Sequence, residues 1–457
     1  MAGHRVERDT MGAVRVPADA LWGAQTQRAL ENFPVSGLRM PARFVAALGL
    51  VKAACADADR SLPAHFRRAI RNASLEVAEG RHDGQFPLDV FQTGSGTSTN
   101  MNANEVIARL ASRALGRPVH PNDDVNRGQS SNDVIPSAAH VAALLAIRDG
   151  LSPSLLALQR SLERKSREWK AAVKLGRTHL MDAMPVTLGQ EFGGYAAQVR
   201  KGREGVERAA EGLRELAIGG TAVGTGVNAP PAFGRRVCAS LRRRLGIPFR
   251  EARDRFEAQG ARDDLARVSG GLRSLAGALT KIANDIRWMG SGPEAGLGEL
   301  ALPGLQPGSS IMPGKTNPVM CEMLVQVAAQ VLGNDATVAL AAQGGHFELN
   351  AMVPVIVHNV LQSIEILSTA CRLFAARCVD GLRANEDRLR ALVERNAVSA
   401  TVLTPKLGYA RVAELVNEAR RRGVSVKALA VERGLVTPRE AERLFDPRRL
   451  TGEASRS

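Results

Sequence analysis

Long segments with a helical apolar period dominate the middle of this sequence and constrain its fold more than any other feature. Leu155, Leu158 and Leu162 recur with the period of a helix rather than that of a strand. The pattern predicts long helices over residues 132–148, 151–172, 187–217, 258–290, 318–344 and 351–379. Helices of roughly 20 to 30 residues joined by short Gly/Pro connections indicate an elongated bundle, which is also suited to self-association.

The composition supports a helical protein. Hydrophobic residues make up 44% of the 457 residues and aromatic residues only 4%, a balance that favours packed helices over a β-sandwich. Short segments between prolines precede the long helices, and short charged segments follow them. We therefore expect a mainly α fold with an N-terminal domain over residues 1–130, a central long-helix domain over 131–383 and a small C-terminal helical domain over 384–457.

The charge pattern bears on the possible partners. The formal net charge is +15, and a nucleic-acid-binding protein would concentrate this charge on one face or in a tail. Arginine is instead spread along the helical segments beside Glu and Asp. We therefore expect no nucleic-acid partner, and the positive excess would help to attract a dianionic substrate.

Other features bear on the compartment and on metals. The sequence has no uninterrupted run of 18 apolar residues, so we expect no transmembrane helix. Met1–Asp9 carries no apolar signal core, which predicts a cytoplasmic protein. The five cysteines are scattered and form no C-x-x-C pair, which argues against a disulfide framework or a zinc site. No tight cluster of His, Cys and carboxylates suggests a metal, so none is expected.

A loop with unusual chemistry lies between two of the predicted long helices. The segment Pro307–Pro318 reads PGSSIMPGKTNP, and its prolines and glycines exclude a helix or strand interior. Backbone amides around its glycines can converge on an oxyanion, and Lys315 can pair with a carboxylate. Ser309 could then act as a proton acceptor, because a serine is a useful base only where its own oxyanion is stabilised. The alternative is an ordinary surface turn.

Two hydroxyl-rich segments lie close to predicted helix starts. Ser95, Thr97 and Ser98 fall just ahead of a helical pattern that begins at Asn104. Ser130, Ser131 and Asn132 fall at the start of the apolar run 134–147. Orphan amides and the helix dipole both favour an anion at such places, so each segment is a candidate carboxylate site. A plain N-cap is the alternative for either one.

A third break, residues 176–185, carries Thr178 and His179. His179 is a candidate general acid or base, because histidine titrates near neutral pH; a structural capping histidine is the alternative. The glycine-rich connector 219–228 lacks the G-K-[ST] ending of a phosphate-binding loop and does not follow a strand.

Together these segments resemble the fumarase/aspartase superfamily over nearly the whole chain. Gly308–Pro318 is similar to its mobile signature loop, and the segments 92–106, 120–133 and 176–185 are similar to its other motifs. The resemblance implies the superfamily fold, in which a long central helical bundle builds the core of a homotetramer. It also implies active sites that are shared between chains, a small dicarboxylate substrate, and no cofactor.

The resemblance assigns roles residue by residue. Ser309 would be the catalytic base, and His179, oriented by Glu322, would act as acid toward the departing hydroxyl through water. The substrate carboxylates would be held by Ser95, Thr97, Ser130, Ser131, Asn132, Thr178, Ser310, Lys315 and Asn317. A second anion site would use His120, Asn122 and Asp123. Thr221 and Asn228 of the glycine-rich connector would lie near the active site.

Within the superfamily the sequence is most similar to the class II fumarases. This implies reversible hydration of fumarate to (S)-malate, a step of the tricarboxylic acid cycle. The alternative is an aspartate ammonia-lyase, but such enzymes commonly carry glutamine in place of His179. Gln306, Thr316 and the pair Val319–Met320 depart from the commonest fumarase pattern and leave the substrate preference open. A catalytically silent structural protein is also conceivable on this fold, although Ser309, Lys315 and His179 are all present.

Overall fold

The computed structural model describes residues 3–452. The ends of the first and last predicted domains, residues 1–2 and 453–457, lie outside the described residues. So does the start of Met1–Asp9, the segment that carries no apolar signal core. The described chain is mainly helical, as predicted, and its strands form five two-stranded sheets. It divides into two compact units. Unit 1 comprises residues up to Pro153, Gly202–Gly277 and Val327–Thr369, and unit 2 comprises Ser154–Lys201, Ala278–Gln326 and the residues from Ala370 onward. The three predicted domain ranges stay a prediction.

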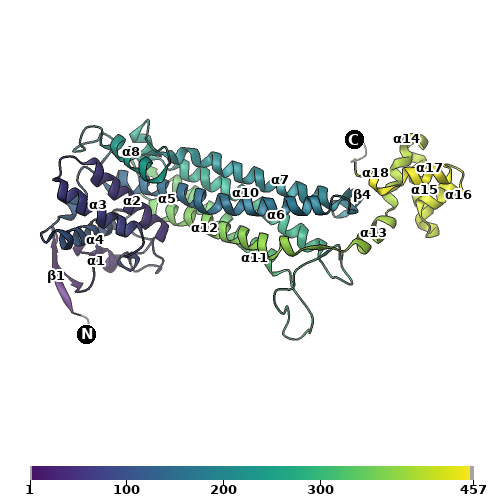
Figure 1. Cartoon of the computed structure of the whole chain (residues 1–457), viewed down its shortest axis with the longest axis horizontal. Coiled ribbons are helices and arrows are strands. Elements are labelled where there is room, and N and C mark those ends of the chain that lie inside the picture. Colours follow the sequence, from purple (N-terminus) through teal and green to yellow (C-terminus); the bar gives the residue numbers. More distant parts are fainter. Residues whose placement is uncertain (1–2, 453–457) are drawn as a thin grey trace. The chain divides into compact units, whose positions relative to one another are not determined.

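The elements follow the chain in the order that Figure 1 shows. The longer helices are α1 (Ala24–Asn32), α2 (Ala42–Ala58), α3 (Ala64–Ala78), α4 (Thr97–Leu115), α5 (Ser131–Ala146), α6 (Ser152–Glu168), α7 (Leu188–Ala209), α8 (Phe233–Leu245), α10 (Asp263–Met289), α11 (Val319–Ala342), α12 (Val353–Arg377), α13 (Glu386–Glu394) and α15 (Tyr409–Arg422). The shorter ones are α9 (Arg255–Gly260), α14 (Thr404–Leu407), α16 (Val426–Glu432), α17 (Pro438–Leu444) and α18 (Pro447–Leu450).

The strands are short and pair mostly with their neighbours in the chain. Antiparallel pairs are formed by β1 (His4–Asp9) with β2 (Gly12–Pro17), β3 (Val173–Thr178) with β4 (Met181–Thr187), β7 (Leu300–Ala301) with β10 (Arg383–Ala384), and β8 (Gly345–His346) with β9 (Leu349–Asn350). The strands β5 (Glu215–Leu216) and β6 (Arg250–Glu251) pair in parallel.

The six predicted long helices are confirmed, with boundaries shifted by a few residues at most places. The first two of them are joined, because a π-helical turn (Ile147–Leu151) links α5 directly to α6. The helix predicted over 258–290 is divided into α9 and the much longer α10. The helical period is a local property of the chain, which is why its recurrence in the sequence located these elements well.

Helix α2 lies at the centre of unit 1. It packs against α3, α5 and α8, and α3 packs in turn against α4; Figure 1 shows α2, α3 and α4 together near the N-terminus. The helix is buried on nearly all sides, with Phe44, Leu48 and Val51 fully inaccessible. A side chain at Gly49 would meet the backbone of α3 at 2.7 Å. This glycine therefore allows the two helices to approach closely.

Unit 2 contains the β3–β4 hairpin and the C-terminal helices. Trp169, Phe192 and Tyr195 form a chain of edge-to-face aromatic contacts beside the hairpin's first strand. The C-terminal helices α15, α16 and α17 enclose a small apolar core of their own, which includes Leu403, Leu415 and Leu429. These helices gather next to the C-terminus in Figure 1.

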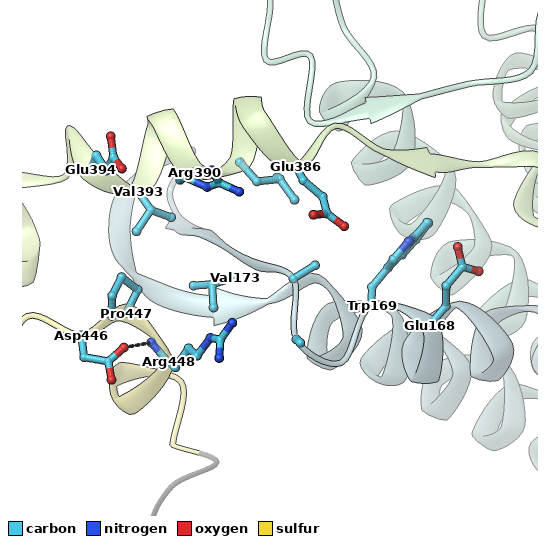
Figure 2. A pocket seen from close by; sticks show the side chains of 13 residues that line it. Glu168, Trp169, Val173, Glu386, Arg390, Val393, Glu394, Asp446, Pro447 and Arg448 are labelled. Atoms are coloured by element: carbon cyan, nitrogen blue, oxygen red, sulfur yellow. Dashed lines mark hydrogen bonds between the residues drawn. The ribbon is translucent and has the colours of Figure 1, made fainter.

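Unit 2 also contains a cavity of about 400 Å³ beside α13. Figure 2 shows Trp169 and Val173 on one side of it, Glu386 and Arg390 on α13, and Arg448 on α18. The backbone N–H of Arg448 donates to the carboxylate of Asp446. None of the site residues predicted from the sequence lines this cavity.

Three helical segments are long and apolar enough to cross a membrane by length and composition alone: Ser131–Glu168, Val319–Ala342 and Val353–Gly381. The sequence has no uninterrupted run of 18 apolar residues, because polar residues interrupt each of these segments. More than half of the most apolar window is buried inside the protein for the first and third segments, but only 33% for the second. The absence of a membrane partner stays a prediction.

Three local expectations were wrong. The glycine-rich connector 219–228 was expected not to follow a strand, but the short strand β5 (Glu215–Leu216) lies just ahead of it. The helix expected to begin at Asn104 begins at Thr97, so Thr97 and Ser98 lie in its first turn rather than ahead of it. Residues 176–185 were interpreted as a plain break between helices, but they belong to the β3–β4 hairpin. The apolar periodicity of the sequence carries no signal for these features.

Candidate active site

In unit 1 the first hydroxyl-rich segment forms the N-terminus of α4. Gly96 precedes the helix in the left-handed conformation, with φ 76°. The chain is held close to another segment here, because a side chain at Gly94 would meet the carbonyl oxygen of Ala351 at 1.8 Å. The backbone N–H of Val353 also donates to the Gly94 carbonyl oxygen at 2.9 Å. This backbone contact fixes the position from which Ser95 and Thr97 extend.

The second hydroxyl-rich segment forms the N-terminus of α5. Ser130 caps the helix and forms a reciprocal capping box with Asp133. Ser131 is the first helical residue, and its hydroxyl lies 2.7 Å from that of Thr97, which lies 2.7 Å from the hydroxyl of Ser95. The structure therefore brings two of the predicted carboxylate-binding segments together at the N-termini of two helices, where an anion is favoured.

The glycine-rich connector meets the same helix start. Asp133 is fully buried and accepts hydrogen bonds from the backbone N–H groups of Gly219 and Thr221, both at 2.9 Å. Burial raises the pKa of the Asp133 carboxyl group, and these backbone donors oppose the shift. Asn132 donates to the Ala222 carbonyl oxygen at 2.8 Å. The connector is thus tied to α5 by two neighbouring side chains.

The backbone of Thr221 is strained at the point where the glycine-rich connector meets α5. It has φ 55°, an unusual conformation for a β-branched residue, and Asn228 in the same connector has φ 63°. The Thr221 hydroxyl is buried and has no hydrogen-bond partner within residues 3–452. A buried hydroxyl without a partner is unusual in a folded protein, and it lies where the connector meets the start of α5.

A cation that the sequence analysis missed lies beneath the second segment. Lys52 on α2 is 1% exposed, and its ammonium group donates to Asn126 Oδ1 and Gln129 Oε1, both at 2.9 Å. Burial lowers the pKa of Lys52 to about 8. A lone lysine in the apolar helical run Leu48–Ala56 was a signal that could have identified it.

The predicted second anion site lies at the surface of unit 1. His120 is exposed, caps the π-helical turn Pro121–Val125, and accepts the backbone N–H of Asp123 on its Nδ1. Asn122 and Asp123 line a cavity of about 560 Å³ together with Arg127, whereas His120 does not. The structure thus places two of the three predicted residues in one cavity, and the role of this loop stays a prediction.

In unit 2 the signature loop folds back on itself. The Gly308 N–H donates to the Lys315 carbonyl oxygen at 2.8 Å, and the Asn317 side chain donates to the Gly308 carbonyl oxygen at 2.9 Å. Ser310 and Lys315 are exposed, and Ser309 and Asn317 are half-buried. Figure 1 draws the segment ahead of α11 as an open loop. The predicted ligand groups of Ser310 and Lys315 therefore face solvent, whereas the side-chain amide of Asn317 closes the loop.

The Ser309 hydroxyl has a specific local environment. Its oxygen accepts the backbone N–H groups of Ile311 at 3.2 Å and Met312 at 3.0 Å. Two backbone donors on one hydroxyl oxygen would stabilise negative charge there, which is the requirement for a serine to accept a proton. The loop itself provides these donors, so the arrangement does not depend on any other element.

His179 and Thr178 lie at the tip of the β3–β4 hairpin and are exposed. His179 lines a cavity of about 760 Å³ with three cationic side chains, Lys174, Arg177 and Lys281. Glu322 lies in the first turn of α11 and is half-buried. No hydrogen bond or ion pair joins His179 to Glu322 within the described chain, so their pairing stays a prediction.

The predicted residues are therefore distributed over both units. Those from Ser95 to Asn132, the residues of the second anion site, and Thr221 and Asn228 belong to unit 1. Thr178, His179 and the residues from Ser309 to Glu322 belong to unit 2. Within each unit the residues of one motif lie close together. Within residues 3–452, no group of three or more His, Cys, Asp or Glu side chains is arranged to hold a metal ion.

Comparison with known proteins gives a consistent match over nearly the whole chain. The family described as "Lyase" matches residues 12–333, and the family described as "Fumarase C C-terminus" matches residues 400–452. A protein named "Fumarate hydratase class II" from Corynebacterium efficiens is 54% identical over 436 residues, which cover 94% of this chain and 92% of that protein. The protein of the same name from Mycobacterium tuberculosis (strain H37Rv) is 54% identical over 442 residues, with 96% and 93% covered.

A solved structure gives the same result. The class II fumarase from Schistosoma mansoni superposes with a TM-score of 0.96 at 36% sequence identity. The match covers 98% of this chain and 99% of that one.

Proposed function

This chain belongs to the lyase family that contains the class II fumarate hydratases, and from that membership we infer that it catalyses the reversible hydration of fumarate to (S)-malate. The match runs through almost the entire length of both chains, so it includes every segment discussed for the active site. Aspartate deamination is not favoured, because relatives at about half identity are named fumarate hydratases.

The observation that carries the mechanism is the environment of Ser309. In the direction of dehydration, a base removes a proton from the methylene carbon of malate, and negative charge develops on the adjacent carboxylate. The hydroxyl on the neighbouring carbon then takes up a proton and leaves as water. Ser309 is proposed as the base, because the Ile311 and Met312 amides donate to its oxygen and would stabilise it in the deprotonated form.

The acid and the carboxylate anchors are assigned on the same basis. His179 is proposed to supply the proton to the departing hydroxyl through water, with Glu322 orienting its ring. The hydroxyls of Ser95, Thr97 and Ser131 and the helix N-termini that carry them are suited to one carboxylate. Lys315 supplies an exposed ammonium group for the other. Ser130, Asn132, Thr178, Ser310 and Asn317 complete the proposed set.

We further propose that the protein is a homotetramer whose active sites combine segments of several chains. The support lies in α11, where an apolar helix leaves Leu332 46% and Leu340 72% exposed. A helix with apolar residues on several faces needs partners on several sides, and further copies of this chain would supply them. A cytoplasmic location is also proposed, because the five cysteines are free and buried, as expected in a reducing compartment.

The proposed reaction is tested by following the ultraviolet absorbance of fumarate with the purified protein, with and without added ammonium, and by identifying the product by chromatography. Malate formation that does not need ammonium is the expected result. Aspartate formed only with ammonium would replace hydration by the ammonia-lyase reaction, and no turnover in either condition would overturn both. Light scattering on the same preparation tests the tetramer, which predicts four times the mass of one chain.

A further inference from the structure

A buried carboxylate lies behind the hairpin that carries His179. Glu299 is fully inaccessible to solvent, and both of its oxygens face the guanidinium group of Arg177. Arg177 Nη1 donates to Glu299 Oε2 at 3.0 Å, and Arg177 Nη2 lies 2.9 Å from Glu299 Oε1. One hydrogen bond and one close ion-pair contact therefore join the Arg177 guanidinium group to the Glu299 carboxylate.

A second cation and a second carboxylate lie next to this pair. The Lys174 ammonium group lies 3.5 Å from Glu299 Oε2 and 3.0 Å from Glu191 Oε2. Lys174 is itself almost completely buried. Two cations and two carboxylates thus form one network, in which Arg177 has Glu299 as its carboxylate partner.

The main chain of Glu299 is held as firmly as its side chain. Its N–H donates to the Met289 carbonyl oxygen at 2.8 Å, at the end of α10, and its carbonyl oxygen accepts the N–H of Asn385 at 2.9 Å. The main chain of Glu299 is therefore held in place on both sides, and its carboxylate pairs with Arg177.

The turn between β3 and β4, which follows Arg177 in the chain, is strained. Thr178 pairs with Met181, so His179 and Leu180 are the two residues of the turn. Both have positive φ, 56° for His179 and 60° for Leu180. A two-residue turn of this kind strongly prefers Asn-Gly, and a bulky residue such as Leu180 rarely adopts this conformation. Strain of this kind persists only where the surrounding structure enforces it.

We propose that Glu299 is a positioning residue for His179: by holding Arg177, two residues before His179, it keeps the strained turn in the conformation that presents the imidazole to the cavity. Arg177 and His179 line the same cavity, and Glu299 lies behind it. The inference rests on the proposed function for its kinetic consequence, because His179 matters to turnover only if it transfers a proton. Both cations of the network, Lys174 and Arg177, lie on β3, the strand that leads into this turn.

The kinetic test uses Glu299→Gln, Arg177→Lys, the double variant and a matched control. Glu299→Gln keeps the shape but removes the charge, and Arg177→Lys keeps the charge but removes the planar guanidinium group that reaches both Glu299 oxygens. We expect each single variant to lower kcat for fumarate by about 10- to 100-fold, as for a displaced catalytic group, with KM changed by no more than about threefold. The double variant should lose no more than about twice what the larger single variant loses, since both changes break one connection.

The control is Glu215→Gln. Glu215 also faces an arginine with two contacts, from Arg250 Nε at 3.1 Å and Nη2 at 2.9 Å, and its strand β5 carries none of the proposed site residues. This variant should keep kcat. Unchanged kcat in Glu299→Gln, an equal loss in Glu215→Gln, or additive losses in the double variant would each overturn the proposal.

A second measurement does not depend on activity. A crystal structure of Glu299→Gln should show the His179–Leu180 turn displaced or relaxed from positive φ, whereas Glu215→Gln should leave it unchanged. An undisturbed turn in Glu299→Gln would overturn the positioning role even in an active enzyme. If the wild-type protein failed to hydrate fumarate, the proposed reaction would fall, while this structural result would still decide the link between Glu299 and the turn.

Discussion

The hydroxyl oxygens of Thr97 and Ser131 lie 2.7 Å apart, although 34 positions separate the two residues in the sequence. Each hydroxyl belongs to the first turn of its helix, α4 or α5. The contact joins two helix N-termini, so the orphan backbone donors of both helices are concentrated in one place. In the proposed reaction this is where one carboxylate of fumarate would bind.

Replacement of Thr97 by valine should weaken the binding of fumarate. Thr97→Val keeps the shape of the side chain but removes the hydroxyl that links Ser95 to Ser131. A lost hydrogen bond to a charged group corresponds to about 1.5–3 kcal/mol, so KM should rise by about 10- to 100-fold. Initial rates at several fumarate concentrations measure this. Ser137→Ala is the control, because it removes a buried hydroxyl from the same helix α5 that bonds only the Asp133 carbonyl oxygen; a KM that rises equally in both variants would contradict the assignment.

Replacement of Ser309 by alanine should abolish turnover and leave the protein folded. Loss of a general base corresponds to a decrease of about 10²- to 10⁴-fold in kcat. Within residues 3–452 the hydroxyl accepts two loop amides and no other group, so the melting temperature and the oligomeric state should stay as in the wild type. Ser399→Ala, which removes a hydroxyl bonded to the Asn396 carbonyl oxygen in the same unit, should keep full activity. Full activity in Ser309→Ala would remove the base assignment.

Replacement of His179 by asparagine should lower kcat for both directions of the reaction. The side chain is exposed at the hairpin tip, so the change should not affect folding, and loss of the proton donor corresponds to about 10²-fold or more. Asparagine is also among the non-glycine residues that best tolerate the positive φ of this turn. Steady-state rates with fumarate and with malate test this. His82→Gln, at a histidine that contacts Glu76 in unit 1, provides the comparison and should retain its activity.

Lys52 should make stability increase with pH in the alkaline range. Burial lowers the pKa of Lys52 to about 8, against an ordinary value of 10.5. Between these two pH values the unfolded chain holds a proton that the folded chain has released, so the free energy of unfolding rises with pH. The full contribution is about 3 kcal/mol across this window, and none of it is gained below pH 8.

The measurement is denaturant unfolding at pH 7.5 and at pH 9.5 for the wild type and for Lys52→Met. The methionine variant cannot release this proton, so its unfolding free energy should rise less, or fall more, between the two pH values than that of the wild type. Other titrating groups are common to both proteins and cancel in the comparison. Equal pH dependence in the two proteins would show that Lys52 is not shifted.

The sequence located most helices because the helical period is repeated within each segment. The six predicted long helices lie where the apolar period placed them, with boundaries shifted by a few residues at most places. The start of α4 was missed because Thr97–Asn100 shows no apolar period, and this turn is helical because Thr99 and Asn100 are buried by other elements. The β3–β4 hairpin was missed because His179–Leu180 carries none of the usual turn residues.

By itself the sequence determined the helical fold, because the helical period recurs within each helix. It also determined the chemistry available to the site, because Ser309, Lys315 and His179 each lie in a short motif. Only the tertiary structure decided that Thr97 meets Ser131, that Lys52 lies under Asn126 and Gln129, and that Glu299 holds Arg177. The physical reason is that helix hydrogen bonds join residues four apart, whereas each of these contacts joins residues tens to more than a hundred positions apart. Such contacts form only when the whole chain packs, so no local pattern predicts them.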